Sequence, residues 1–359
     1  MLKKILSLLL CLTVVCSFAA CGEPETPPVP QTDELIYDAS QPHLIAACDT
    51  KLRGIVVFDL DRCEGDFNRL TESSSVVWEW YPEKINDTIL ASTDGRIADA
   101  KLRYSSYLKK DVVIAVSSSG WAGVIDYRSQ RMLWEAEIGS SPHSVEMLPN
   151  GDLVIACSGG NDWSRNGRLV YVPFSQGETE PTHTIKIPSA HGIQWDPEFE
   201  ILWVVYYDGI VAVEIQDYNT PEATLCELSG YGATFDSTDS SGHDLAPVYG
   251  QPGKYWVTGS KGVWLFDSKT LEMTKQYDRF IYYTGNNVKG ISYFPDGTMV
   301  QCVAGEGGNT TYDWSTYELR VIYFGVDENG ELLPQRVNAN FASAGREFYK
   351  VHNFCKDYQ

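Results

Sequence analysis

Short runs of alternating apolar and polar residues recur along the chain, most of them opened by a glycine and closed by a polar turn. A period of two predicts a half-buried β-strand, because successive side chains of a strand face opposite sides. The six runs are Gly54–Asp59, Gly123–Tyr127, Arg168–Val172, Gly209–Glu214, Gly262–Asp267 and Leu319–Phe324. The pattern therefore predicts a chain built from repeated, strand-rich units.

A second strand precedes most of these runs and follows a turn signal of proline, asparagine, aspartate or glycine. Proline fixes the negative φ of a turn's first corner, and glycine and asparagine tolerate positive φ. The strands concerned are Leu153–Cys157, Ile201–Val205, Tyr255–Thr258 and Met299–Cys302. With a further short strand ahead of each turn, the unit is a meander of about 45 to 50 residues, the size of a propeller blade.

The two ends of the chain complement each other. The segment Phe348–Phe354 has the pattern of the innermost strand of a blade, but no outer strands of a blade follow it. Outer strands that lack an innermost strand are found at Leu44–Cys48, Ile55–Phe58 and Val76–Trp80. One blade shared by both ends closes the ring and removes free sheet edges. We therefore predict one all-β propeller over residues 42–359 with six blades, or seven if Cys63–Ala98 contains further strands.

The first 20 residues have the three parts of a secretory signal: a basic start, an apolar run and small residues before Cys21. The apolar run is shorter than the roughly 18 residues of a membrane-spanning helix. Phe18–Cys21 resembles a lipobox, in which the cysteine is lipidated. Residues 21–41 are rich in proline and acidic side chains and are expected to form a flexible tether. We expect a domain anchored by its lipid to the cell envelope, outside the cytoplasm.

Composition narrows the set of partners. The chain has 28 basic and 48 acidic residues, a net charge of −20, which excludes the electrostatic surface that nucleic acids require. The propeller segment contains no CxxC or Cys/His finger spacing, so a structural zinc site is not expected. Cys48 and Cys355 are the pair to test for a disulfide. We expect a monomer whose only membrane contact is the lipid.

Histidines and lysines open the innermost strands of the repeat. They are Lys101, His143, His191, His243, Lys289 and His352. This position lies at the mouth of a propeller's central channel, so the six side chains are expected to converge. Blade duplication can also leave a repeated histidine with a purely structural role. The lysines in two blades favour a functional site, because a structural motif had no reason to change there.

Two chemistries suit this set of side chains. Imidazoles from His143, His191 and His243 suit a divalent metal such as Mn, Zn or Ca with one open position. Alternatively, Lys101 and Lys289 bind a carboxylate while a neutral histidine removes a proton. Both possibilities stay open at the level of the sequence.

Aromatic residues in loops around the same mouth suit a platform for sugar rings, although any of them can belong to the core. They are Tyr104, Trp121, Trp163, Tyr282, Tyr283 and Trp314. The nearest carboxylates are Asp99, Glu146 and Asp244, of which the last two are candidate substrate contacts. Their spacing does not identify the acid and nucleophile pair of a glycosidase.

Several of these segments resemble a family of bacterial secreted propellers known only as domain of unknown function 6528. The segments are Pro142–Gly151, His191–Asp196, Gly242–Pro247 and Lys289–Ile291. The chain is more distantly similar to oligogalacturonate lyases, propellers that hold manganese on three histidines and a glutamine and remove a proton next to a uronate carboxylate. This similarity implies a metal on His143, His191 and His243, with Lys289 or His352 in place of the glutamine.

These observations favour a carbohydrate-active protein, preferably a lyase for uronate-containing oligosaccharides. In this hypothesis Lys101 and Lys289 neutralise the carboxylate, a histidine is the base and the metal acidifies the proton. A hydrolase is the nearest variant and depends on Glu146, Asp99 or Asp244. The alternatives are a non-catalytic receptor for a glycan or small anion, and a scaffold for partner proteins.

Overall fold

The computed structural model describes residues 43–82, 95–162, 166–178, 180–220, 222–235, 241–276, 287–326 and 331–358. The predicted signal, Cys21, the tether, Trp163, Tyr282 and Tyr283 lie outside these residues. No helix in the described ranges is long and apolar enough to cross a membrane.

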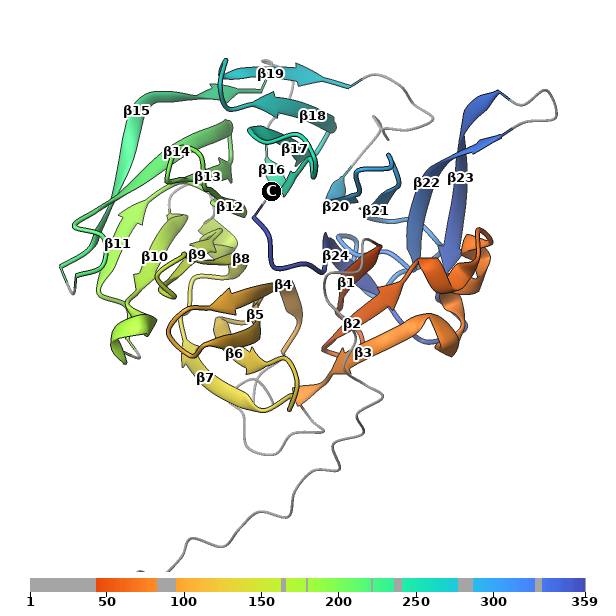
Figure 1. Cartoon of the computed structure of the whole chain (residues 1–359), viewed down its shortest axis with the longest axis horizontal. Coiled ribbons are helices and arrows are strands. Elements are labelled where there is room, and N and C mark those ends of the chain that lie inside the picture. The colour runs from red at the N-terminus through yellow and green to blue at the C-terminus, as the bar shows by residue number, and fades with distance from the viewer. Residues whose placement is uncertain are drawn as a thin grey trace, which may run out of the picture. The chain divides into compact units, whose positions relative to one another are not determined.

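The described strands form six antiparallel sheets of four strands each, arranged as blades around a central axis (Figure 1). From the centre outward, the first blade consists of β24 (Phe348–Asn353), β1 (Leu44–Asp49), β2 (Gly54–Asp59) and β3 (Val76–Trp80). The second consists of β4 (Ile97–Ser105), β5 (Lys110–Ser117), β6 (Trp121–Asp126) and β7 (Met132–Glu137). The third consists of β8 (Pro142–Met147), β9 (Leu153–Cys157), β10 (Arg168–Val172) and β11 (His183–Lys186).

The remaining blades repeat this order. The fourth consists of β12 (Gly192–Asp196), β13 (Ile201–Tyr206), β14 (Gly209–Gln216) and β15 (Thr224–Thr234). The fifth consists of β16 (Gly242–Pro247), β17 (Lys254–Gly259), β18 (Gly262–Asp267) and β19 (Glu272–Lys275). The sixth consists of β20 (Val288–Tyr293), β21 (Met299–Val303), β22 (Glu318–Val326) and β23 (Leu332–Asn340).

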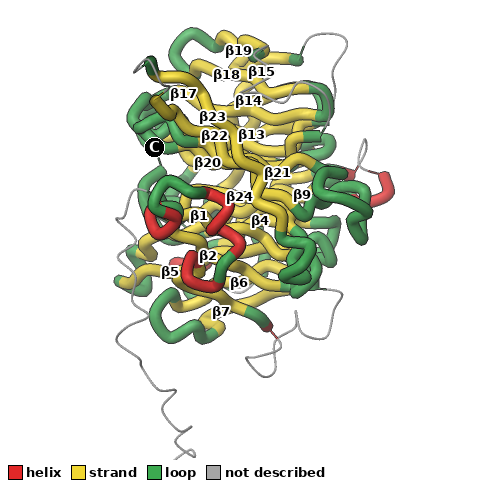
Figure 2. The backbone as a smooth tube through the Cα atoms, turned by 90° about the vertical axis from the view of Figure 1, so that its right-hand side faces the viewer, coloured by secondary structure: helices red, strands yellow, loops and turns green. Residues whose placement is uncertain are grey.

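Five short 3-10 turns lie between the described strands (Figure 2). They are η2 (Asp61–Cys63), η3 (Phe67–Thr71), η4 (Ser73–Ser75), η6 (Gly160–Asp162) and η7 (Phe174–Gln176). Three of these turns lie between β2 and β3, in the segment that left room for a seventh blade. The prediction of six blades is confirmed.

The predicted closure of the ring is also confirmed. β24 pairs antiparallel with β1, with His352 opposite Ala46 and Val351 opposite Ala47. The last strand of the chain thus becomes the innermost strand of the first blade. The proposed disulfide is wrong, because Cys48 and Cys355 are both free thiols and Cys48 is buried in the core.

Apolar side chains fill the spaces between adjacent blades. In β9, Leu153 and Ile155 belong to the cluster shared with the second blade, whereas Val154 and Ala156 belong to the cluster shared with the fourth. Each strand therefore buries both of its faces, which explains its nearly continuous apolar sequence. Burial of about 25 cal/mol per Å² of apolar surface makes these interfaces the main stabilising term.

Candidate functional site

A bulge near the start of the innermost strands sets the geometry of the channel. The pairing of β4, β8, β16 and β20 with their neighbours shifts by one residue. The extra residues are Ala98, His143, His243 and Lys289. A bulge re-aims a side chain, and here it brings two consecutive residues of each strand to the channel.

The innermost strands consequently form three successive rings, one residue per blade. The upper ring consists of Ala98, His143, His191, His243, Lys289 and Tyr349. The middle ring consists of Asp99, Ser144, Gly192, Asp244, Gly290 and Lys350. The lower ring consists of Lys101, Glu146, Gln194, Ala246, Ser292 and His352.

This register corrects two of the predicted ring members. Lys101 and His352 belong to the lower ring, not to the upper ring with the other histidines. The sequence pattern aligned short tripeptides, which carry no information about an inserted bulge residue. His143, His191, His243 and Lys289 are brought together as predicted.

The upper ring is a chain of close contacts. The rings of His143 and His191 have centroids 4.3 Å apart, and those of His191 and His243 are 5.6 Å apart. Nζ of Lys289 lies 2.8 Å from Nε2 of His243. The ring of Tyr349 lies 6.0 Å from that of His143. His143 is half-buried and the other members are almost completely buried.

Hydrogen bonds fix which ring nitrogens carry a proton. Nδ1 of His143 lies 2.8 Å from the carbonyl oxygen of Ser141, and Nδ1 of His191 lies 2.9 Å from that of Ser189. A carbonyl only accepts, so both Nδ1 atoms carry hydrogen and both Nε2 atoms are free acceptors. While Lys289 is protonated it donates to Nε2 of His243, and the proton of that ring is then on Nδ1. The described residues provide no hydrogen-bond partner for this Nδ1.

Burial keeps the upper ring largely uncharged. It lowers the pKa of His143 to about 4 and holds the pKa values of His191 and His243 well below their usual range. Burial also lowers the pKa of Lys289 to about 7, with Asp313 opposing the shift and Lys350 adding to it. Near neutral pH the three imidazoles are therefore neutral, and Lys289 exchanges its proton in the physiological range.

Acidic and basic side chains pair with each other in the middle and lower rings. Oδ2 of Asp99 accepts from Oγ of Ser144 at 2.5 Å, and Oδ1 lies 2.8 Å from Nε2 of His352. Oδ1 of Asp244 lies 3.2 Å from Nζ of Lys350. Burial raises the pKa of Asp99, but the charges of His352 and Lys101 outweigh it and lower the pKa overall. Both aspartates are buried and lie at ion-pair distance from a basic side chain of the channel.

Glu146 is held by a bidentate ion pair. Its two oxygens lie 2.6 and 2.9 Å from the guanidinium nitrogens of Arg103, and Nζ of Lys101 lies 3.5 Å away. These contacts lower the pKa of Glu146 against the effect of its burial. The carboxylates on which a hydrolase would depend are thus buried and paired below the upper ring.

The C-terminal tail covers the lower end of the channel. In Figure 1 this end of the chain lies over the centre of the ring. Nε2 of Gln194 donates to the carbonyl oxygen of Tyr358 at 2.8 Å, and the Tyr358 hydroxyl donates to that of Met147 at 2.7 Å. The guanidinium of Arg103 lies 5.0 Å from the centre of the Tyr358 ring. The C-terminal tail therefore covers the lower ring.

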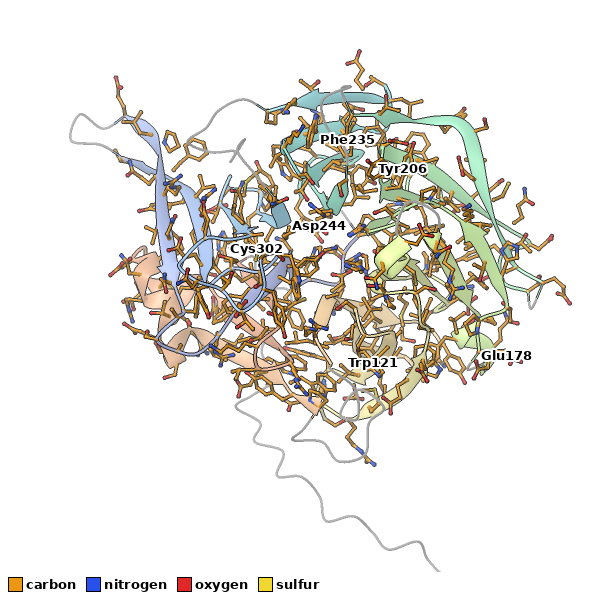
Figure 3. All side chains as sticks on the ribbon, turned by 180° about the vertical axis from the view of Figure 1, so that it is seen from behind. Trp121, Glu178, Tyr206, Phe235, Asp244 and Cys302 are labelled. Carbon is orange, nitrogen blue, oxygen red and sulfur yellow. The ribbon has the colours of Figure 1, made fainter. Side chains whose placement is uncertain are left out.

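Two predicted platform residues lie elsewhere. Trp121 is buried in the core, where its Nε1 donates to Oε2 of Glu135 at 2.8 Å and its ring stacks on Trp80. Figure 3 shows Trp121 away from the centre and Asp244 near it. Tyr104 is 52% exposed but lies near the opposite end of β4 from the upper ring. Strand periodicity does not reveal which end of a blade a residue occupies.

Another group of side chains borders the upper ring and was not fully recognised from the sequence. The Trp314 ring packs edge-on at 5.3 Å against Tyr349 and stacks at 4.6 Å on Tyr312. The guanidinium of Arg96 lies 4.9 Å from the centre of the Tyr312 ring. Of these four residues only Trp314 was predicted. Tyr349 was detectable only with the bulge register in hand.

A metal on the three histidines stays a prediction. Among the described residues, no group of three or more His, Cys, Asp and Glu side chains is arranged to hold a metal ion. His143 and His191 each have a free Nε2, as metal ligands do. His243, however, directs Nε2 to Lys289.

The model of a family of unknown function matches residues 3–315 of the chain. No curated protein matches the chain. Similar solved structures include a protein of unknown function from Desulfotomaculum acetoxidans, with 11% identity, a TM-score of 0.46, and 88% of this chain and 100% of that chain covered.

Two further structures are similar at the same level. The β-propeller domain of Cps50 (Swd1) from Myceliophteria thermophila has 11% identity and a TM-score of 0.41, covering 67% of this chain and 75% of its own. A chain of the mitotic checkpoint complex has 14% identity and a TM-score of 0.44, covering 94% and 88%. At these identities the likeness assigns no activity.

Proposed function

The chain belongs to DUF6528, a family of unknown function, and we propose that the upper ring of its channel binds a carboxylate-bearing carbohydrate of the uronate class. The lipid anchor predicted at Cys21 would hold this site outside the cytoplasm, within reach of soluble polysaccharide fragments. Lys289 is the residue that carries the proposal.

Lys289 differs from the other lysines of the channel. Lys101 lies within 4 Å of Asp99 and Glu146, and Lys350 lies 3.2 Å from Asp244. Within the described residues, no carboxylate lies at ion-pair distance from Lys289, which contacts a neutral imidazole instead. A buried ammonium without a counter-charge is unfavourable. A bound carboxylate supplies that charge and forms a charge-assisted hydrogen bond.

The remaining groups of the upper ring suit the rest of a sugar. The free Nε2 atoms of His143 and His191 accept hydrogen bonds from hydroxyl groups. Nδ1 of His243 is a buried donor without a partner in the described part of the chain. Tyr349 and Trp314 form an apolar wall beside these polar groups, against which the ring next to the acidic sugar would pack. A few fixed polar groups beside an apolar wall are typical of small-molecule sites.

The same site also suits a lyase reaction. A free Nε2 would take the proton next to the carboxylate, and the glycosidic C–O bond would break as the ring double bond forms. The resulting imidazolium would return this proton to the leaving oxygen, which restores the neutral histidine and gives a free hydroxyl. Yet an imidazole with a pKa of about 4 is a weak base near neutral pH. This observation favours binding without turnover as the primary function.

Isothermal titration calorimetry of the purified protein with trigalacturonate, and with maltotriose as the uncharged comparison, tests the proposal. We expect binding of the acidic sugar alone and a loss of at least tenfold in Lys289→Met. The control is Lys186→Met, which removes an exposed lysine of β11. Equal binding by both variants would refute the assigned site.

Ultraviolet absorbance of the unsaturated product separates a lyase from a receptor. Product formation that is lost in His191→Ala while binding persists would establish chemistry. Binding without product would establish a receptor.

A further inference from the structure

The segment between β21 and β22 brings aromatic rings to the upper ring. Trp314 packs against Tyr349, and Tyr312 stacks on Trp314 with their planes 12° apart. The charge of Asp313 acts on Lys289, so this segment borders the proposed anion site. Tyr312 and Trp314 are each half-buried and keep part of their surface exposed to solvent.

One buried carboxylate holds this segment in place. Oε2 of Glu347 accepts from the backbone nitrogen of Thr311 at 3.1 Å, and Oε1 accepts from that of Tyr312 at 3.2 Å. Oε1 also accepts from Oγ of Ser315. The carbonyl oxygen of Glu347 accepts from the backbone nitrogen and hydroxyl of Thr50, at 2.7 and 3.0 Å. Glu347 therefore joins the aromatic segment to the first blade.

The partners of Glu347 indicate what this carboxylate does. Its side chain is fully buried, and no lysine or arginine of the described residues lies at ion-pair distance. Burial raises its pKa, but hydrogen bonds from Ser315, Thr311 and Tyr312 outweigh that effect and lower it. The carboxylate is thus ionised and stabilised only by hydrogen bonds. Donors of the aromatic segment supply those bonds. The buried carboxylate of Glu347 therefore fixes the conformation of this segment.

We propose that Glu347 is the positioning residue of a second sugar subsite, whose aromatic wall is formed by Tyr312, Trp314 and Tyr349. The inference rests on the proposed function, since Lys289 holds the first, acidic sugar and the wall receives the next ring of an acidic oligosaccharide. Sugar rings pack on aromatic faces, and a wall held in advance avoids the entropic cost of ordering a loop on binding.

Calorimetry with galacturonate and trigalacturonate on Glu347→Gln tests the subsite. Glutamine retains the size but turns one acceptor into a donor that faces backbone N–H groups. We expect about a tenfold weaker affinity for the trimer and an affinity for the monomer within twofold of that of the unaltered protein. The control is Glu198→Gln, which removes the carboxylate of an exposed pair with Lys269, away from the aromatic segment. Equal losses for both sugars, or no loss, would overturn the proposal.

A measurement without ligand keeps the inference separate from the proposed function. In protein labelled with 5-fluorotryptophan, Trp314→Phe identifies the Trp314 signal among the ten tryptophans. Glu347→Gln is expected to shift or broaden this ¹⁹F signal and leave the others in place. An unchanged Trp314 signal would refute the positioning role, even if no sugar binds.

If Glu347→Gln disturbs every tryptophan signal, the variant Ser315→Ala is used in its place. It removes one hydrogen-bond donor of the same network. We then expect the selective effect on Trp314 from Ser315→Ala, and its absence would contradict the proposal.

Discussion

Nζ of Lys289 lies 2.8 Å from Nε2 of His243, deep in the mouth of the channel. One ring further down, Lys350 faces the carboxylate of Asp244 at 3.2 Å. The two lysines therefore differ in partner: one contacts a neutral imidazole and the other an anion. This contrast separates the proposed binding site from the part of the channel that stabilises the ring.

Lys289 is expected to destabilise the folded protein at low pH. Its pKa falls from 10.5 to about 7 on folding, so between these values the unfolded chain retains a proton that the folded chain has lost. Stability therefore rises with pH across this window, and the penalty is complete below about pH 7. We expect Lys289→Met to increase the free energy of unfolding by on the order of 2 to 4 kcal/mol at pH 6.

Urea unfolding at pH 6 and pH 10 measures this effect, and the gain should shrink at the higher pH. A gain that is independent of pH, or a loss at pH 6, would show that Lys289 is not a strained cation.

The Arg103–Glu146 pair is expected to be essential for stability. Glu146→Gln leaves Arg103 buried without its counter-charge, and breaking a buried pair in this way costs about 3 to 5 kcal/mol. Urea unfolding measures the change. Glu198→Gln, which breaks the exposed pair with Lys269, serves as the control and should have no measurable effect. Similar results for the two variants would contradict the structural role of the lower ring.

Gly290 is expected to tolerate no side chain. A Cβ there would lie 2.8 Å from the backbone nitrogen of Val351 and 3.0 Å from Cα of Lys350, in the strand that closes the ring. Gly290→Ala should lower the free energy of unfolding by about 1 to 3 kcal/mol. In Gly325→Ala the new Cβ would meet side chains and no backbone, Cγ of Gln335 at 2.9 Å and Cε2 of Tyr323 at 3.8 Å, so the loss of stability should be smaller. An equal effect in both variants would argue against close packing of the innermost strands.

The fold was predictable because the propeller repeats one pattern. The apolar run Gly262–Asp267, for example, corresponds to β18 with the same limits. The incomplete patterns at the two ends, around Leu44 and Phe348, correctly indicated a shared blade. Strand alternation and turn residues are local properties, so one sequence carries them in full.

The site was predictable only in part. His143, His191, His243 and Lys289 were correctly grouped, because each lies at or beside a strand start. Lys101 was misplaced because the bulge at Ala98 leaves no sequence signal. Register and burial depend on the packing of other blades, which periodicity does not encode.

Measuring the metal content distinguishes between two interpretations of the upper ring: an anion site, and the metal site predicted from the sequence. Plasma mass spectrometry on the purified protein, after incubation with manganese, zinc and calcium, is expected to find no stoichiometric metal, because Lys289 occupies Nε2 of His243. The control is the variant with His143, His191 and His243 all changed to alanine. Near-stoichiometric metal that is lost in this variant would establish a metal centre in place of the anion site.

A crystal structure of the protein with trigalacturonate tests most directly whether Lys289 binds the sugar carboxylate. We predict a carboxylate oxygen within about 3.2 Å of Nζ of Lys289 and a second sugar ring against Trp314. A sugar bound only elsewhere would contradict this assignment, for instance in the hollow of about 690 Å³ lined by Trp78 and Arg346. Absence of bound sugar at saturating concentration would contradict it equally.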